Sequence, residues 1–313
     1  MTARVDEPLE VDLAASAAAA ARKQSFIGRL ARNQSVVIGA LIVAIMLAIG
    51  VLAPVLGTID PAAINPAARN LKPGTERNVI NAEGVSERRK FLMGTDSLGR
   101  DIYSRVLYGA RVSLIVGAAA AAISIVIGLA IGLVSGYIRW VDAIGMRIMD
   151  GLMAIPGILL AIGLVSLWGA GLLTVIAAIS VPEIPRVVRL VRSVVLTIRE
   201  EPYVEAAISV GTRTHMILLR HILPNTVAPI IVQATFICAS AILAEAILSF
   251  LGIGIPPEVP TWGNIMAEGR SYFRVHPHMI AFAGIFLAIT VLAVNMLGDG
   301  LRDTLDPRLG KRI

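Results

Sequence analysis

The chain has 313 residues, of which 56% are apolar and only 16% are charged, and its mean hydropathy is +0.76. Soluble domains contain about 25% charged residues, so this composition excludes a soluble globular enzyme, a disordered chain and a collagen-like fibre. The single cysteine, Cys238, excludes an internal disulfide framework and a cysteine-based zinc site. We interpret the net charge of +6 as a sign of membrane topology rather than of nucleic-acid binding, because the cytoplasmic flanks of membrane helices are rich in Lys and Arg.

Long apolar runs predict an all-α membrane protein with about six transmembrane helices. A spanning helix needs about 20 apolar residues, and runs of this length lack the alternation of membrane β-strands. The first run follows a leader of 34 residues, which is too long for a cleaved signal peptide. A tight turn at 168–171 separates the third run from the fourth. The six predicted spans cover about residues 35–56, 112–136, 148–168, 170–195, 225–250 and 278–298.

The distribution of Lys and Arg predicts that both termini are cytoplasmic. An even number of spans places the termini on one side, and with both inside, the cytoplasmic segments hold 17 of the 28 Lys and Arg residues. The outer segments hold 11, nine of them in one long loop, and long loops follow the positive-inside rule poorly. The predicted parts are a cytoplasmic tail (1–34), a transmembrane domain (35–298) with outer loops 57–111 and 251–277, and a second cytoplasmic tail (299–313).

The first tail ends in a cluster of basic residues. Arg22, Lys23, Arg29 and Arg32 follow an alanine-rich stretch. This pattern favours a basic helix that lies on the inner membrane surface. The alternative is a disordered extension that contributes only to topology.

Small residues and prolines mark particular faces and breaks of the predicted spans. Gly128, Gly132 and Gly136 recur every four residues, which lines one helix face with glycine and lets another helix pack closely. This face serves either an interface within the chain or one with a partner subunit. Pro156, Pro182 and Pro185 break backbone hydrogen bonds inside predicted spans. Each break is expected to be either a moving part of a gate or a static kink.

Three acidic residues lie within the apolar runs, and ionisable residues at such positions are candidates for function. Asp150 lies at the inner edge of its run, where an interfacial position is expected. Glu183 precedes Arg186 by three residues, which predicts a local ion pair. Glu245 is deeper and is expected to line a translocation path or to pair with a partner helix; Pro156 is the second candidate for that path.

The segment 199–224 is unusually polar and is predicted to form an elbow of two short helices. Residues 203–210 form the first helix, Gly211 permits a left-handed turn, and residues 212–223 form the second with Thr212 as its N-cap. Pro224 is expected to end that helix before the next span. Ala206 and Ala207 give a smooth surface, which fits either docking of another protein or an amphipathic connector on the membrane.

The elbow resembles the EAA loop of bacterial ABC-transporter permeases. The resemblance rests on Glu205-Ala206-Ala207, on Gly211 and on Ile222-Leu223-Pro224, with His221 in place of the usual isoleucine. Four further blocks resemble the C-type subunits of dipeptide and oligopeptide permeases: GTDSLGRDIYSRVLYGARVSL (94–114), RHILPN (220–225), AEAILSFLGIG (244–254) and NMLGDGLRDTLDPRL (295–309).

This resemblance implies the architecture of a type I ABC-importer permease in a bacterial inner membrane. The implied partners are a second, B-type permease subunit, two cytoplasmic ATPase subunits or domains, a periplasmic or lipid-anchored substrate-binding protein, and membrane lipid. ATP and Mg²⁺ would be bound by the ATPase subunits, with no cofactor in this chain. The implied substrates are short peptides, with glutathione, nickel, an opine or another small solute as alternatives. The residues implied to couple to the ATPase are Glu205, Ala206, Ala207, Gly211, Leu223 and Pro224.

The outer loop 251–277 is stiffened by prolines and is implied to receive the binding protein. Trp262 is expected at the membrane interface, where tryptophan is common. Arg270 and Arg274 could meet acidic residues of that partner.

Motifs for other functions are missing from the sequence. It has no G-x-x-x-x-G-K-[ST] phosphate loop, no H-E-x-x-H zinc motif and no evident G-x-S-x-G nucleophile motif, so the chain is predicted not to be an enzyme or to bind a metal. A secondary transporter would need internal repeats, which are not evident, and would leave the elbow unexplained. A channel or scaffold subunit would not depend on an ATPase, which an ATPase co-purification experiment distinguishes.

Overall fold

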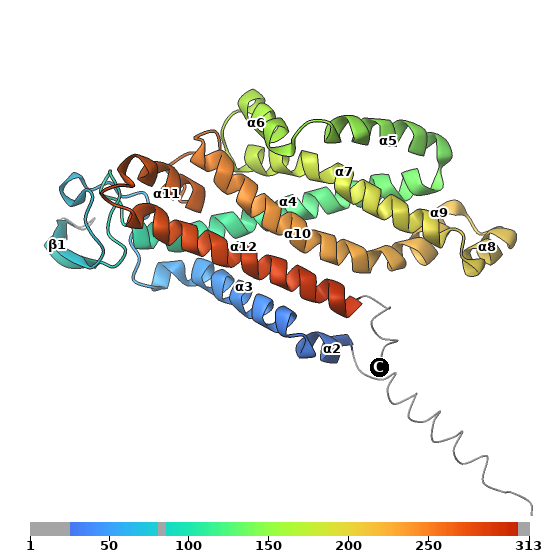
Figure 1. Cartoon of the computed structure of the whole chain (residues 1–313), viewed down its shortest axis with the longest axis horizontal. Helices are drawn as coiled ribbons and strands as arrows, with labels where there is room; N and C mark the ends of the chain where they lie inside the picture. The colour runs from blue at the N-terminus through green and yellow to red at the C-terminus, as the bar shows by residue number, and fades with distance from the viewer. Residues whose placement is uncertain (1–25, 81–85, 306–313) are drawn as a thin grey trace, which may run out of the picture.

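The computed structural model describes residues 26–80 and 86–305, and long helices packed side by side dominate it (Figure 1). The basic residues Arg22 and Lys23 lie outside the described residues. α2 (Phe26–Arg32) leads into α3 (Gln34–Leu52), which Asn33 caps with its side chain. The other long helices of the bundle are α4 (Ile102–Tyr137), α7 (Leu172–Ile198), α10 (Leu223–Phe250) and α12 (His278–Leu305).

Two sets of contacts hold the bundle together. α4 packs along α7 and α10, while α12 packs along α3 and α10, so α10 joins the two halves. Glycines bring α3 onto α12, because a Cβ at Gly39 would lie 2.8 Å from the carbonyl oxygen of Ala293. The apolar core between these helices consists of three clusters, centred on Trp262, Ile179 and Val191.

Length and composition identify four helical stretches of the structure that can cross a membrane: Gln34–Val55, Ile102–Tyr137, Thr214–Phe250 and His278–Leu305. α5 (Arg139–Met153) and α6 (Gly157–Trp168) count as one further span if the pair is taken together, although they meet at 89°. α7 has 27 residues and coincides with the fourth predicted span, but one glutamate and three arginines interrupt its apolar surface. The predicted spans are thus formed by helices, as expected.

The third predicted span needs a correction, because the chain turns sharply within it. The range 148–168 is divided between the end of α5 and the whole of α6. Pro156 has no N–H to donate and adopts an extended backbone (ψ 125°) just before α6. α5 is amphipathic and lies along α7, to which Asp142 and Asp150 are joined by ion pairs with Arg192 and Arg189.

The glycine face of α4 packs within the chain, which decides between the two predicted alternatives. Gly128, Gly132 and Gly136 are all buried against α7. Added Cβ atoms would lie 2.5, 2.7 and 2.6 Å from the Cβ atoms of Val187, Val191 and Val195 respectively. Any larger residue would therefore force α4 and α7 apart.

The segment predicted as the first outer loop has structure of its own. A hairpin of β1 (Thr75–Ile80) and β2 (Ser86–Phe91) pairs antiparallel, with Thr75 opposite Phe91. Short 3₁₀ turns lie at Ala53–Val55 and Pro66–Ala68. α4 begins at Ile102, ten residues before the predicted span, because Asp101 caps it by accepting the Ser104 N–H.

A buried ionic cluster joins this outer segment to α11 (Trp262–Gly269). Arg100 donates from Nε to Asp96 at 2.7 Å and pairs with Glu268 of α11, and Arg105 Nη2 lies 3.5 Å from Glu268. Trp262 is fully buried beside this cluster, with its Nε1 donating to the Val106 carbonyl at 3.1 Å. Trp262 is thus enclosed by the protein, and its position at the membrane interface stays a prediction.

Candidate functional site: the elbow between α7 and α10

The elbow begins with α8 (Pro202–Ser209), and a turn at a glycine ends this helix. Gly211 has a φ of +76°, as predicted for a left-handed turn. Its N–H bonds to the carbonyl of Ile208 at 2.9 Å, and the Thr212 N–H bonds to that of Ala207 at 3.0 Å. This pair of bonds is a Schellman motif, which closes a helix and reverses the chain direction.

The second half of the elbow differs from the prediction. α9 (Thr214–Ile217) follows Arg213 rather than Thr212, and a π-helical turn (Leu218–Ile222) runs directly into α10. Pro224 therefore does not end the helix. It lies where the π-helical turn passes into α10, within the continuous helical stretch Thr214–Phe250.

The π-helical turn connects the elbow rigidly to α10. Asn225 donates from Nδ2 to the His221 carbonyl at 2.7 Å, a bond between the first turn of α10 and the π-helical turn. The same Nδ2 lies 3.4 Å from the hydroxyl of Tyr203 on α8, and the rings of Tyr203 and His221 are 6.3 Å apart. Both arms of the elbow thus contact the start of α10.

One side of the elbow is anchored in the core. Val204, Ile217 and Ile222 are each at most 1% exposed. They pack in one cluster with Val195 and Ile198 at the end of α7. This anchoring means that α8 and α9 cannot shift without disturbing α7 and α10.

The other side of the elbow is exposed and apolar, and we call it the elbow surface. Glu205 and Ala206 are exposed while Ala207 is half-buried, and the Glu205 carboxylate has no hydrogen-bond or ion-pair partner among the described residues. The apolar members are 45% to 82% exposed: Tyr203, Ile208, Val210, Met216 and Leu219. An exposed apolar patch of this kind is typical of a surface that contacts another protein or the membrane.

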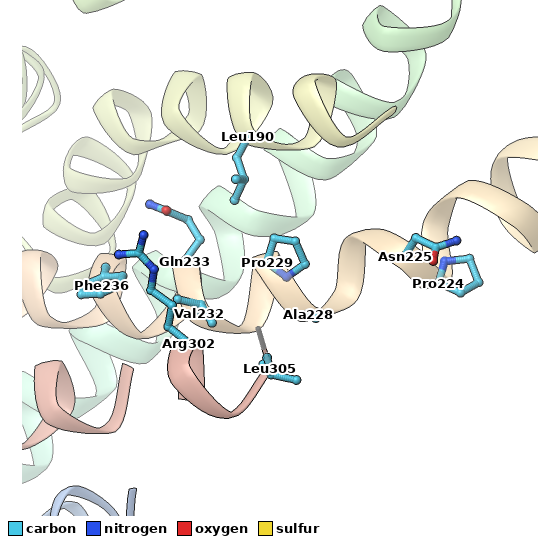
Figure 2. Close-up of a pocket in the computed structure, with 10 residues that line it drawn as sticks. All are labelled: Leu190, Pro224, Asn225, Ala228, Pro229, Val232, Gln233, Phe236, Arg302 and Leu305. Atoms are coloured by element: carbon cyan, nitrogen blue, oxygen red, sulfur yellow. The ribbon is translucent and has the colours of Figure 1, made fainter. Parts of the chain in front are cut away.

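A hollow of about 740 Å³ adjoins the elbow, between α7, α10 and the end of α12 (Figure 2). Pro224 and Asn225 belong both to the elbow and to its wall. Gln233 and Arg302 supply polar groups to an otherwise largely apolar lining. No pattern in the sequence predicts this hollow, although Pro229 inside α10 indicates an irregular helix. The remaining lining residues are Leu190, Ala228, Val232, Phe236 and Leu305.

The other predicted site residues are not brought to the elbow. Glu245 is fully buried, and its carboxylate accepts hydrogen bonds from Ser249 at 2.8 Å and Ser113 at 3.3 Å. This enclosure gives no support to a translocation-path role for Glu245. Pro156 is exposed at the break between α5 and α6. Glu183 makes the predicted ion pair with Arg186, at 2.8 Å.

Comparison with known proteins decides the family. Residues 106–311 match the model of the binding-protein-dependent transport system inner membrane component, and residues 23–73 match the N-terminal transmembrane domain of oligopeptide transport permease C. The chain belongs to this family of transport permeases. A putative peptide transport system permease of Brucella abortus is 45% identical to this permease over 281 residues, which is 90% of each chain.

Two further relatives carry more specific names. The dipeptide transport system permease protein of Alkalihalophilus pseudofirmus is 39% identical over 282 residues, 90% of this permease and 88% of the relative. A glutathione transport system permease of Escherichia coli is 46% identical over 217 residues, 69% of this permease and 72% of the relative. The printed names of these relatives include both dipeptide and glutathione transport.

Among solved structures, a chain of the inward-facing MetNI methionine ABC transporter has the same fold. The TM-score is 0.51 at 20% identity, over 66% of this permease and 96% of that chain. The predicted type I importer fold is confirmed. So are the predictions of a permease subunit rather than an enzyme, and of a multi-pass protein of the bacterial inner membrane. ATP hydrolysis takes place on separate ATPase subunits with which this permease works.

Proposed function

We propose that this permease forms half of the translocation channel of a short-peptide importer and receives the force of ATP binding through its elbow surface. The observation that carries the proposal is the elbow itself, which is anchored by Val204, Ile217 and Ile222 and exposes an apolar surface around Glu205. A second permease subunit of B type completes the channel, a substrate-binding protein delivers the peptide from outside, and lipid surrounds the bundle.

The mechanism follows from how the elbow is attached. Closure of the ATPase pair moves the elbow surface. The π-helical turn and the Asn225 hydrogen bond pass that movement to α10, and the cluster around Val195 passes it to α7. ATP can shift the channel between inward-facing and outward-facing states only if contacts at the elbow differ between them. We place those contacts at Glu205, Ala206 and Ala207, with Gly211, Leu223 and Pro224 holding the geometry.

The test is charge reversal on the elbow surface in the complete transporter, reconstituted in vesicles. Glu205→Arg is expected to leave folding intact while ATP hydrolysis no longer drives peptide uptake, because the free carboxylate is lost. Glu200→Arg is the matched control, since Glu200 is also exposed but precedes α8. Equal uptake in Glu205→Arg and the unmodified transporter would remove the coupling role from this surface.

The substrate is tested separately. The names of the relatives support short peptides first and glutathione second. Uptake by the reconstituted transporter, with dipeptides and glutathione supplied in parallel on the binding protein, distinguishes them. Uptake of neither would contradict the proposed substrate class.

A further inference from the structure

The structure contains a second hollow, of about 360 Å³, at the break between α5 and α6. α6 contributes Gly157 and Ala161 to its wall, α7 contributes Pro182, and α10 contributes Ser240 and Leu243. This volume lies within the range of small-molecule sites. In secondary transporters, substrate sites near the middle of the bilayer are commonly formed where helices are broken.

The hollow is lined by an ion pair within the membrane domain. Glu183 and Arg186 both face it, and Arg186 Nη1 lies 2.8 and 2.9 Å from the two carboxylate oxygens of Glu183. Arg186 is 14 residues from the start of α7 and 12 from its end, which places it about 20 Å from each.

The accessible member of this pair is the cation. The side chain of Arg186 is 55% exposed, whereas that of Glu183 is only 10% exposed. Only Nη1 of Arg186 has a protein partner among the described residues, so Nε and Nη2 remain available as donors. These two groups form the edge of the guanidinium that matches a carboxylate with two parallel hydrogen bonds.

The other arginines of α7 are not available in this way. Arg189 Nη2 lies 2.6 Å from Asp150, and Arg192 Nη2 lies 2.7 Å from Asp142, both on α5. These pairs fix α5 to α7. Arg186 alone of the three is paired on its own helix, so its exposed edge is tied to no other element.

We propose that Arg186 binds the terminal carboxylate of the peptide as it passes through this hollow. Glu183 holds the guanidinium in place and offsets its charge, so that the site can release the peptide. This inference rests on the proposed function, because it assigns a peptide to the channel. It adds a chemical requirement, which is that the substrate carries a free carboxylate.

The test compares uptake of a dipeptide with uptake of its C-terminal amide in the complete reconstituted transporter, with binding protein saturated in each case. Arg186→Gln is expected to lower uptake of the free dipeptide about 10- to 100-fold, the effect of losing hydrogen bonds to a charged group. Uptake of the amide should change far less. Arg186→Lys should keep part of the preference for the carboxylate, and Glu183→Gln should keep it because the cation remains.

Arg189→Gln is the matched control, as it removes the same charge three residues away. It should leave the ratio of carboxylate to amide uptake unchanged. An unchanged ratio in Arg186→Gln, or an equal fall for both substrates, would overturn the inference even if the unmodified transporter imports peptides. If Arg186→Gln does not fold, an Arg186→Lys variant whose ratio of carboxylate to amide uptake equals that of the unmodified transporter would also overturn it. Failure of the unmodified transporter to import either substrate would instead contradict the proposed function.

Discussion

Individual side chains determine how closely the helices approach, and the glycines of α4 show this most directly. The side chains of Val187, Val191 and Val195 of α7 pack directly against these glycines, so at these three positions α4 contributes no side chain to the contact. Close packing of this kind replaces the hydrophobic effect inside a membrane, where lipid is as apolar as the side chains. A single methyl group added at one of these glycines would therefore disturb the packing of α4 on α7.

Gly132→Ala is expected to destabilise the protein by about 1–3 kcal/mol, as overpacking does. The new Cβ would lie 2.7 Å from Val191 and 3.0 Å from the Val188 carbonyl oxygen. Gly163→Ala is the control, because Gly163 is also helical but has no atom within 4 Å of an added Cβ. Thermal melting in detergent should show a lower melting temperature for the first variant only. Similar melting temperatures would contradict the packing account.

The buried carboxyl of Asp101, at the start of α4, is expected to make the free energy of unfolding depend on pH. Burial raises the pKa of this carboxyl above its ordinary value of 3.8, although hydrogen bonds from Ser104 act in the opposite direction. The folded state therefore holds a proton more tightly than the unfolded chain does. This contribution to stability is complete below the ordinary pKa and is lost as the pH rises through the raised one.

Asp101→Asn should remove this effect, since asparagine caps a helix equally well and does not titrate. The melting temperature of the unmodified protein should fall relative to that of Asp101→Asn as the pH is raised from about 4 to about 7. A relative rise over the same range would show that the folded state prefers the charged form.

At the scale of one residue, sequence predicts local pairs well and distant partners poorly. The Glu183–Arg186 pair follows from a spacing of three residues on a helix. The burial of Trp262 depends on the Val106 carbonyl, which is 156 positions away in the chain. No local pattern contains that information, and the same holds for the enclosure of Glu245 by Ser113.

Among the elements, the elbow depends on one backbone conformation more than on any side chain. Gly211 adopts a φ of +76°, and an added Cβ there would meet no atom within 4 Å. A substitution at this position therefore acts through the backbone alone. Non-glycine residues resist this conformation, with asparagine as a tolerated exception.

Gly211→Pro should abolish coupling, because proline fixes φ near −65° and cannot adopt the turn. Gly211→Asn should retain ATP-driven uptake within about twofold, since asparagine accepts left-handed backbone angles. Co-purification of the ATPase subunits should follow the same order. Comparable coupling in the proline variant would show that the turn is not needed.

Element types were predictable where the apolar pattern is long, and boundaries were not. The Gly211 turn follows from the sequence, but the continuation of the helix through Pro224 does not, because a proline within a helix and a proline after one look alike locally. The 89° break between α5 and α6 was signalled by Pro156, yet its angle depends on ion pairs between α5 and α7. The strands β1 and β2 lack the alternation of apolar and polar residues that predicts a hairpin.

For the molecule as a whole, the buried ionic cluster holds the segment before α4 to α11. Arg100 and Arg105 are at most 4% exposed and share Glu268 of α11. Both also donate to the Pro257 carbonyl, at 3.3 and 3.1 Å. Loss of one member leaves charges buried without their partner.

Glu268→Gln is thus expected to destabilise the protein by about 3 kcal/mol. Glu76→Gln is the control, because it breaks the pair with Arg88 in the hairpin, whose side chains are 44% and 77% exposed respectively. That exposed pair should be worth less than about 1 kcal/mol. Chemical denaturation that gives equal losses for the two variants would contradict a structural role for the cluster.

The class of the whole molecule was predictable because hydropathy determines it, and the elbow was predictable because its residues are contiguous. The Glu183–Arg186 hollow was not, since it combines α6, α7 and α10.

The central claim, that the elbow surface is where the ATPase acts, can be tested by cross-linking. Ala206, on this surface, is changed to cysteine in a background in which Cys238, the only cysteine of the chain, is changed to alanine. A short thiol cross-linker is then applied to the assembled transporter. The account predicts a product joining this permease to an ATPase subunit, with a yield that changes when nucleotide is added. A transporter that is active but forms no such product, with or without nucleotide, would contradict it.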